Sequence, residues 1–211
     1  MKGRIDEMTG LRNREALELQ LKETSQECEG VALALIDVDH FLDINRLFGH
    51  DTGDHVLKTI ADILKEQTSE QAVFRVSGDE FAVVLADFSL EQGFLKMESV
   101  RAAVQASNER FQLPADEQAQ EISVTVGVAQ YPRDAKDMNG LMRAANAALM
   151  SAKESGRNQV ALPPNEEMVM KTCYYPATMV RQLKTLAEKL KKKESILFRE
   201  ALADLIRKYD R

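Results

Sequence analysis

The chain has 211 residues, of which 44% are hydrophobic and 29% are charged, and its formal net charge is -6 at pH 7. This composition predicts a packed core and excludes collagen-like, mucin-like and wholly disordered proteins. No apolar run approaches the roughly 18 residues that cross a bilayer, and the first residues lack the apolar stretch of a signal peptide. We therefore expect a cytoplasmic protein with no membrane partner.

The two cysteines, Cys28 and Cys173, are far apart in the sequence and belong to no C-x-x-C or Cys/His spacing. A structural zinc site and a disulfide framework therefore lack support. We expect two reduced and chemically inert thiols.

The sign of the charge changes along the chain. Residues 1–163 contain 17 Lys and Arg against 27 Asp and Glu, a net charge of -10, whereas residues 164–211 contain 11 against 7, a net charge of +4. The change falls at a Pro-Pro-Asn-Glu-Glu stretch, which interrupts any periodic pattern. The sequence predicts an acidic domain over 1–163, a linker over 164–167 and a basic module over 168–211. An acidic domain that handles an anionic substrate needs metal ions, and a basic module suits a polyanion.

Hydrophobic periodicity predicts alternating helices and strands in the acidic domain. The expected helices cover residues 13–22, 53–65, 90–111 and 138–155, and the expected strands cover residues 31–36, 73–76, 81–85 and 122–129. Asn13 caps the first helix, and Gly156 ends the last. The apolar run 31–36 is typical of a strand buried on both faces, and Gly78-Asp79 favours a tight hairpin. We predict an α/β fold with a mixed central sheet flanked by helices.

Carboxylates are expected at two ends of rigid elements. Asp37 and Asp39 follow the buried strand, and Asp79 and Glu80 lie at the hairpin turn. Short carboxylates on rigid elements are the usual ligands of Mg²⁺ or Mn²⁺ in phosphoryl chemistry. Taken singly, each is better explained as a surface residue of a strand end or turn. The flanking sequence favours a site instead.

Several separated segments resemble the motifs of one family. They read DEMTGLRNR at 6–14, DVDHF at 37–41 followed by Asn45, FGHDTGD at 48–54, RVSGDEF at 75–81 and AKESGRN at 152–158. In order and spacing they resemble the GGDEF domain of diguanylate cyclases. The resemblance covers about residues 6–160.

The resemblance implies a homodimer in which each domain binds one GTP. The 3′-hydroxyl of each GTP attacks the α-phosphate of the other, which gives cyclic di-GMP and two pyrophosphates. The metal ligands implied for the Mg²⁺ or Mn²⁺ cofactor are Asp37, the carbonyl of Val38, Asp79 and Glu80. Asp79 also matches the position proposed as the general base, and Glu80 completes the metal shell.

The same resemblance implies a substrate site. Asn45 and Asp54 would recognise guanine, because an amide and a carboxylate match its polar edges and leave those of adenine unmatched. Phe41 and His50 belong to the same motifs and are counted as substrate-binding residues.

Two basic residues of the late motif complete the expected site. Lys153 and Arg157 would neutralise the triphosphate. In an alternative interpretation, Arg157 pairs with Asp6 and holds the ends of the domain together.

The chain departs from the family pattern at several places, three of which bear on function. Ser77 replaces the first glycine of the signature, which is tolerable if its φ is negative and only Gly78 needs an unusual conformation. Leu42 stands where the family commonly has a phosphate-binding lysine, which predicts weaker GTP binding. Residues 68–71 read TSEQ instead of the R-x-x-D motif of product inhibition, so we expect that inhibitory site to be absent.

The basic module is predicted to contain a strand over 169–175 and two helices. The first helix starts at Pro176 and places apolar residues on one face, and the second follows Ser195 and runs to about Tyr209. The apolar residues of the first face are Met179, Leu183, Leu186 and Leu190. A module this small cannot bury a core alone, so it must dimerise or dock.

The module resembles a ribbon-helix-helix domain of the Arc and MetJ type, whose paired strands enter the DNA major groove. In that arrangement Met170, Thr172 and Tyr174 would face DNA, although none of them is the Arg, Asn or Gln that reads bases. A dimerisation module that touches no DNA is the open alternative. The lysines at 191–193 fit either interpretation, since they also suit a solvated helix end.

Two functions follow from the sequence. The first is a homodimeric diguanylate cyclase with a C-terminal ribbon-helix-helix module. The second is a DNA-binding regulator that senses a guanine nucleotide through a catalytically weak or inactive GGDEF domain. The complete set of expected metal and guanine ligands favours the enzyme, whereas Leu42, Ser77 and the basic module favour the sensor.

Overall fold

A computed structural model describes residues 3–113, 121–163 and 175–190, together with Glu194, Leu197, Phe198, Ala201 and Lys208. The chain divides into two compact units, Met1–Glu167 and Met168–Arg211. Within the described residues, no helix combines the length and the apolar character that crossing a bilayer requires.

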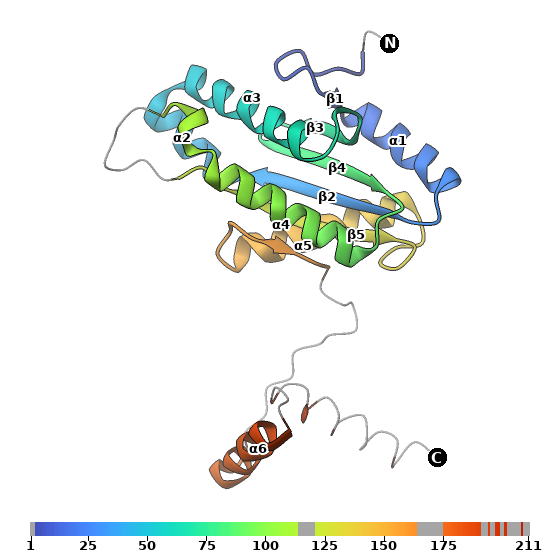
Figure 1. The fold of residues 1–211 in the computed structure, drawn as a ribbon, viewed down its shortest axis with the longest axis vertical. Coiled ribbons are helices and arrows are strands. Elements are labelled where there is room, and N and C mark those ends of the chain that lie inside the picture. Colours follow the sequence, from blue (N-terminus) through green and yellow to red (C-terminus); the bar gives the residue numbers. More distant parts are fainter. Residues whose placement is uncertain are drawn as a thin grey trace. The chain divides into compact units, whose positions relative to one another are not determined.

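A mixed six-stranded sheet with the order β1-β3-β4-β2-β5-β6 forms the centre of the first unit (Figure 1). Its strands are β1 (Arg12–Asn13), β2 (Val31–Val38), β3 (Val73–Ser77), β4 (Glu80–Ala86), β5 (Val124–Tyr131) and β6 (Val160–Ala161). β2 is antiparallel to both of its neighbours, β4 and β5, whereas the β1–β3 and β5–β6 pairs are parallel. Every residue of β2 is buried, as its continuous apolar run predicts.

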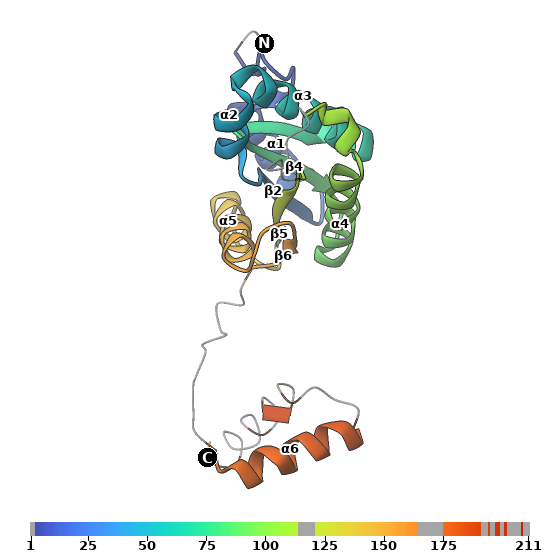
Figure 2. The same cartoon turned by 90° about the vertical axis from the view of Figure 1, so that its left-hand side faces the viewer.

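Helices cover both faces of this sheet. They are α1 (Arg14–Glu27), α2 (Phe41–Phe48), α3 (His50–Gln67), α4 (Leu90–Ala106) and α5 (Met138–Glu154). α1 and α5 pack on the face that carries Leu33 and Leu35, and α3 and α4 pack on the face that carries Ala34 and Ile36. Figure 2 shows α4 and α5 on opposite sides of the sheet. The two cores hold β2 between them and fix where its carboxyl end emerges.

The predicted helices and strands of this unit are present, with shifted ends. The Asn13 side chain caps α1 by accepting a hydrogen bond from the Ala16 amide at 3.2 Å. Gly156 follows α5 with a φ of 115°. The prediction of one helix over 90–111 is wrong at its end, because α4 stops at Ala106 and a short 3₁₀-helix, Asn108–Phe111, follows. Periodicity did not predict α2, since 8 residues give too few turns for a clear pattern.

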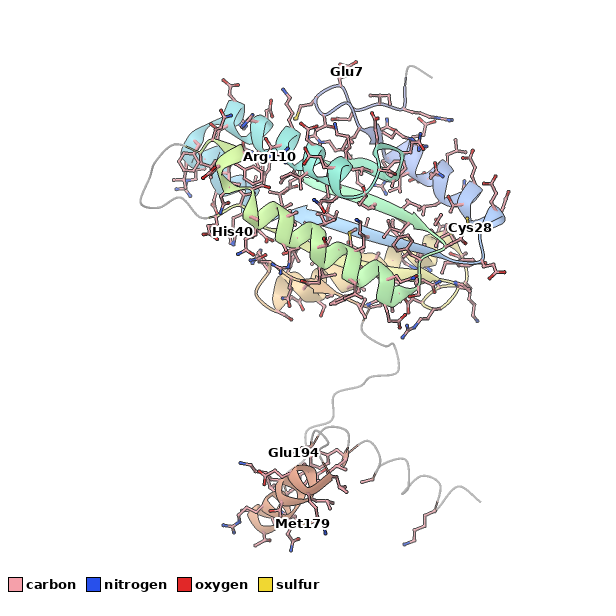
Figure 3. All side chains as sticks on the ribbon, in the orientation of Figure 1. Glu7, Cys28, His40, Arg110, Met179 and Glu194 are labelled. Atoms are coloured by element: carbon pink, nitrogen blue, oxygen red, sulfur yellow. The ribbon has the colours of Figure 1, made fainter. Side chains whose placement is uncertain are left out.

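In the second unit, α6 (Ala177–Leu190) agrees with the helix predicted from Pro176. Ala187 is buried, but Met179, Leu186 and Leu190 of the predicted apolar face are 55%, 45% and 48% exposed. Met179 is labelled in Figure 3. This apolar face is therefore only partly covered within one chain.

The remaining predictions for this unit are largely untested. Met170, Thr172 and Tyr174 of the predicted ribbon lie outside the described residues, as does most of the helix predicted over 195–209. The ring of Tyr175 lies 5.4 Å from that of Phe198, measured between centroids. Tyr175, two residues before α6, thus contacts the stretch in which the second helix is predicted.

Candidate functional site

The predicted metal ligands meet at the carboxyl end of β2. Asp37 lies opposite Glu80 on β4 and opposite Thr125 on β5. The Val38 amide donates a hydrogen bond to the carbonyl oxygen of Asp79 at 3.2 Å. The antiparallel pairing therefore brings carboxylates that are far apart in the sequence together at the carboxyl end of β2.

The signature hairpin is held by its own side chains. Gly78 has a φ of 22°, whereas Ser77 is not among the residues with positive φ, as predicted. The Ser77 hydroxyl donates to Glu80 Oε2 at 2.6 Å, a contact that a glycine could not make. Arg75 donates to the Gly78 carbonyl at 2.7 Å. The serine thus orients one of the predicted metal ligands.

Asp6 pairs with Arg75, at 2.9 Å, and also accepts hydrogen bonds from Thr9. Burial opposes ionisation of Asp6, but the hydrogen bonds from Thr9 and Arg75 outweigh it and lower the pKa of the carboxyl. The alternative prediction of an Arg157–Asp6 pair is wrong. Asp6 lies beside β3, whereas Arg157 precedes β6 at the opposite edge of the sheet.

Asp37 faces a cation. It is 8% exposed, and its Oδ2 accepts a hydrogen bond from Lys153 Nζ at 2.6 Å. Burial raises the pKa of Asp37, and repulsion from Asp79 and Asp39 acts in the same direction, while Lys153 opposes them. Lys153 comes from the last turn of α5, where the helix dipole favours positive charge. The carboxyl end of β2 therefore concentrates negative charge where water has limited access, which favours a bound cation.

The donor chemistry of this edge fits Mg²⁺ or Mn²⁺. Both ions prefer oxygen ligands, and carboxylates supply them here from Asp37 on β2, from Glu80 on the neighbouring β4 and from Asp79 in the turn before β4. Among the described side chains, no three of the Asp, Glu, His or Cys type converge on one point as a finished metal site. In this geometry, the cation at Asp37 is the Lys153 ammonium, so a metal would bind Asp37 in competition with Lys153.

The predicted guanine ligands lie where α2 packs against α3. Asn45 on α2 has a buried Oδ1 with no hydrogen-bond partner. Gly53 on α3 allows α2 to approach closely, because a methyl group there would overlap Asn45 Oδ1 and crowd the ring of Phe41. Asp54 is the next residue of α3 and is partly buried, whereas His50 is exposed at the start of that helix. An unpartnered buried amide costs about 1–3 kcal/mol, which a ligand with a polar edge would recover.

Two residues near the carboxyl end of β2 are exposed. Arg157 lies in the loop after α5, and its side chain makes no ion pair with a described residue. Leu42 is 81% exposed in the first turn of α2, directly after Phe41. Both side chains are accessible to a ligand that binds at this end of the domain.

Sequence reasoning missed the contribution of Gly53 and that of Asp39 with its partners on β5. Gly53 carried a signal, because glycine inside a helix is unfavourable unless close packing requires it. Asp39 stood beside the predicted ligand Asp37, but its partners Ser123 and Thr125 carried no signal of their own.

Known proteins share this fold. Residues 4–159 match the family model described as "Diguanylate cyclase, GGDEF domain". The chain belongs to the GGDEF-domain family. Its basic module lies beyond the matched residues.

Relatives of the GGDEF domain include an uncharacterized membrane protein of Staphylococcus saprophyticus, 35% identical over 167 residues that cover 76% of this chain and 46% of that protein. The chain thus spans about half the length of the curated relatives it matches. The GGDEF domain of YfiN (TpbB) from Pseudomonas aeruginosa is 32% identical, with a TM-score of 0.65, over 74% of this chain and 98% of that chain. The structure of the coiled coil and GGDEF domain of DgcB from Caulobacter crescentus in complex with c-di-GMP is 27% identical, with a TM-score of 0.65. The match covers 76% of this chain and 85% of that chain.

Proposed function

We propose that this GGDEF domain is a diguanylate cyclase that condenses two GTP into cyclic di-GMP and two pyrophosphates across a homodimer. The observation that carries the proposal is the edge formed by Asp37, Glu80 and Lys153. Asp37 and Glu80 lie opposite each other on paired strands, and the Lys153 ammonium is 2.6 Å from Asp37. One edge thus holds both metal-binding carboxylates and a cation suited to a triphosphate.

The residues divide the work between base and phosphates. Asn45 and Asp54 bind the guanine edge, with Phe41 beside Asn45 at the α2–α3 contact and His50 at the start of α3. Lys153 leaves Asp37 when the triphosphate arrives and, with Arg157, neutralises the phosphates.

The reacting end of the nucleotide lies at the metal ligands. Asp37, the carbonyl of Val38, Asp79 and Glu80 would hold Mg²⁺ or Mn²⁺, which would supply charge neutralisation to the α-phosphate. The 3′-oxygen of the second GTP would form the new bond to phosphorus as the bond to pyrophosphate breaks, and Asp79 is the proposed acceptor of the hydroxyl proton.

The second unit supplies the homodimer in this proposal. Met179, Leu186 and Leu190 stay about half exposed on α6 within one chain. Covering such side chains with a second copy stabilises by roughly 1.5–3 kcal/mol for each fully buried one. Linking two catalytic domains in this way raises their effective concentration towards the millimolar range. The ribbon-helix-helix architecture and DNA binding through Met170, Thr172 and Tyr174 stay predictions.

Incubation of the full chain with GTP and Mg²⁺ or Mn²⁺, followed by product chromatography, tests the enzyme directly. We expect cyclic di-GMP and pyrophosphate. Nucleotide binding without product would instead favour the regulator that senses a guanine nucleotide.

Removal of residues 168–211 tests the homodimer separately. We expect a mostly monomeric domain by sedimentation, with a specific activity that rises steeply with protein concentration. A truncated chain that stays dimeric with unchanged specific activity would contradict this role of the second unit.

A further inference from the structure

The two aspartates at the end of β2 have different partners. Asp37 accepts a hydrogen bond from the Lys153 ammonium, whereas Asp39, which is 4% exposed, accepts only from uncharged groups among the residues that the structure describes. Its Oδ2 accepts from the Ser123 hydroxyl at 2.6 Å and from the Asn158 amide at 3.1 Å, and its Oδ1 accepts from the Thr125 hydroxyl at 2.5 Å. A buried carboxylate whose two oxygens both accept hydrogen bonds in this way stabilises the local structure.

The Asn158 amide belongs to a loop with an unusual backbone. Gly156, Arg157 and Asn158 have φ values of 115°, 62° and 44°. For residues other than glycine, this conformation costs on the order of 1 kcal/mol each, so the surroundings must hold it in place. Asp39 does so through the Asn158 amide, which also donates to Thr125 Oγ1 at 3.0 Å.

A second set of contacts holds the same loop from the other side. The Asn158 side-chain oxygen accepts a hydrogen bond from Arg101 at 3.0 Å, and Arg101 is itself paired with Glu98 on α4. The Arg157 amide donates to the Ala152 carbonyl at 3.1 Å. The backbone amides of Arg157 and Asn158 both donate hydrogen bonds, while the Arg157 side chain remains exposed.

β2 and the carboxyl end of α5 are therefore joined at two points. Asp37 contacts Lys153, and Asp39 contacts Asn158. The first contact is an ion pair that a phosphate or a metal can break. The second has no charged partner, so it persists when the first is broken. Arg157 lies directly before the second contact.

We propose that Asp39 is a positioning residue, which holds the loop after α5 so that Arg157 and Lys153 face the nucleotide phosphates. The inference rests on the proposed GTP site and adds to it a division of labour between neighbouring aspartates. Asp37 binds the cation, and Asp39 fixes the groups that neutralise the triphosphate without touching it.

Asp39→Asn is the informative substitution. A carboxylate accepts hydrogen bonds through both oxygens, whereas an asparagine accepts through only one. At least one of the three hydrogen bonds to this side chain would therefore be lost, or reversed if its donor is a hydroxyl. The matched control is Asp134→Asn at the opposite end of β5. Asp134 is also a mostly buried carboxylate, with 15% of its side chain exposed, and it accepts a backbone hydrogen bond from Gln130 at 2.9 Å.

The readout is the affinity of the full chain for GTP with Mg²⁺, measured by calorimetry, and for guanosine, measured by NMR titration. We expect Asp39→Asn to weaken GTP binding about tenfold and to leave guanosine binding unchanged. Asp134→Asn should change neither affinity. Equal losses for GTP and guanosine would overturn the inference, because they would indicate general damage to the fold.

Two further measurements keep the test decisive. In an Arg157→Ala background, Asp39→Asn should cost much less GTP affinity than in the natural chain, and fully additive losses would overturn the inference.

If Asp39→Asn fails to fold, Ser123→Ala provides a milder test, because it removes one partly buried hydroxyl that donates to Asp39. It should produce a smaller loss of affinity that is again confined to GTP. An unchanged GTP affinity in folded Ser123→Ala would then count against Asp39. Failure of the natural chain to bind GTP would refute the proposed function instead.

Discussion

Both ends of β2 carry carboxylates, but the two ends surround them differently. In Figure 3, Cys28 and His40 mark these ends. At the carboxyl end, Asp37 and Asp39 are buried, and Lys153 pairs with Asp37. At the opposite end, Glu27, Glu29 and Asp87 are exposed and line an open hollow of about 550 Å³. Acidic side chains therefore occur at both ends of β2. Only at the carboxyl end, among the described residues, are they buried and paired with a lysine.

The difference shows what turns a group of carboxylates into a candidate site. Exposed carboxylates keep their water and are screened by salt, so they bind cations weakly. Buried carboxylates that face one another favour a cation, because water no longer screens their repulsion. At the exposed end, partial burial and the Asp87 carboxylate raise the pKa of the Cys28 thiol, which keeps it protonated and unreactive.

The largest expected effect comes from Asp37→Ala. Product formation should fall by more than about a hundredfold with the fold intact by circular dichroism, because the triphosphate loses its charge compensation. The matched change at the opposite end, Asp87→Ala, should leave product formation unchanged. Normal synthesis by Asp37→Ala would refute the metal assignment.

The paired change of Asp79 and Glu80 to alanine should remove Mn²⁺ binding in the presence of a GTP analogue, as measured by electron paramagnetic resonance. It should also abolish synthesis, since two of the oxygen donors are lost. The control pair, Glu27 and Glu29 changed to alanine, removes the same charge from the exposed end and should leave Mn²⁺ binding in place. Equal Mn²⁺ binding by both paired variants would contradict the comparison between the ends.

Lys153→Met should weaken GTP binding about tenfold in calorimetry, since a cation of the phosphate pocket is lost. Lys136→Met changes an exposed lysine in the loop before α5, at the opposite end, and should have no effect. If the two variants bind GTP equally well, Lys153 is only the structural partner of Asp37.

The ion pairs of the two ends should differ in their effect on stability. Asp6→Asn should lower the free energy of unfolding by about 1 kcal/mol at about pH 7, because Asp6 pairs with the mostly buried Arg75. The pKa of Asp6 is lowered by folding, so its contribution is present above the unfolded pKa and is lost as the pH falls through the folded pKa. Urea unfolding should therefore show the full loss at neutral pH and a smaller loss as the pH falls below the unfolded pKa of about 3.9.

The control is Glu91→Gln, which breaks an exposed pair with Arg133 at the opposite end. It should leave the urea midpoint unchanged at either pH. A loss in Glu91→Gln as large as in Asp6→Asn would remove the distinction between half-buried and exposed pairs.

The smallest expected effect comes from restoring the cation that the family commonly has. Leu42→Lys should tighten GTP binding by a factor of about 2–5, since a partly screened charge pair contributes on the order of 1 kcal/mol or less. Leu95→Lys, at an exposed leucine of α4, serves as the control. Unchanged or weaker affinity in Leu42→Lys would place this residue away from the phosphates.

The sequence by itself predicted most of the elements and the carboxylates at the carboxyl end of β2. Residues 31–36 are apolar without interruption, which is typical of a strand buried on both faces and places Asp37 at its end. Gly78-Asp79 specified the hairpin that brings Glu80 opposite Asp37. These features follow from local rules of periodicity and turn chemistry, which single residues express directly.

Only the tertiary structure decided which distant side chains meet. Arg157 and Asp6 fit as a pair by charge, but they lie near opposite edges of the sheet, and the order of strands is not written in any one segment. The burial of Asp39 against Ser123 and Thr125 depends on the register between β2 and β5. The burial of the unpartnered Asn45 oxygen depends on how closely α2 approaches Gly53. Such contacts arise from the packing of complete elements, because each partner is an ordinary residue until the sheet and helices bring it beside the other.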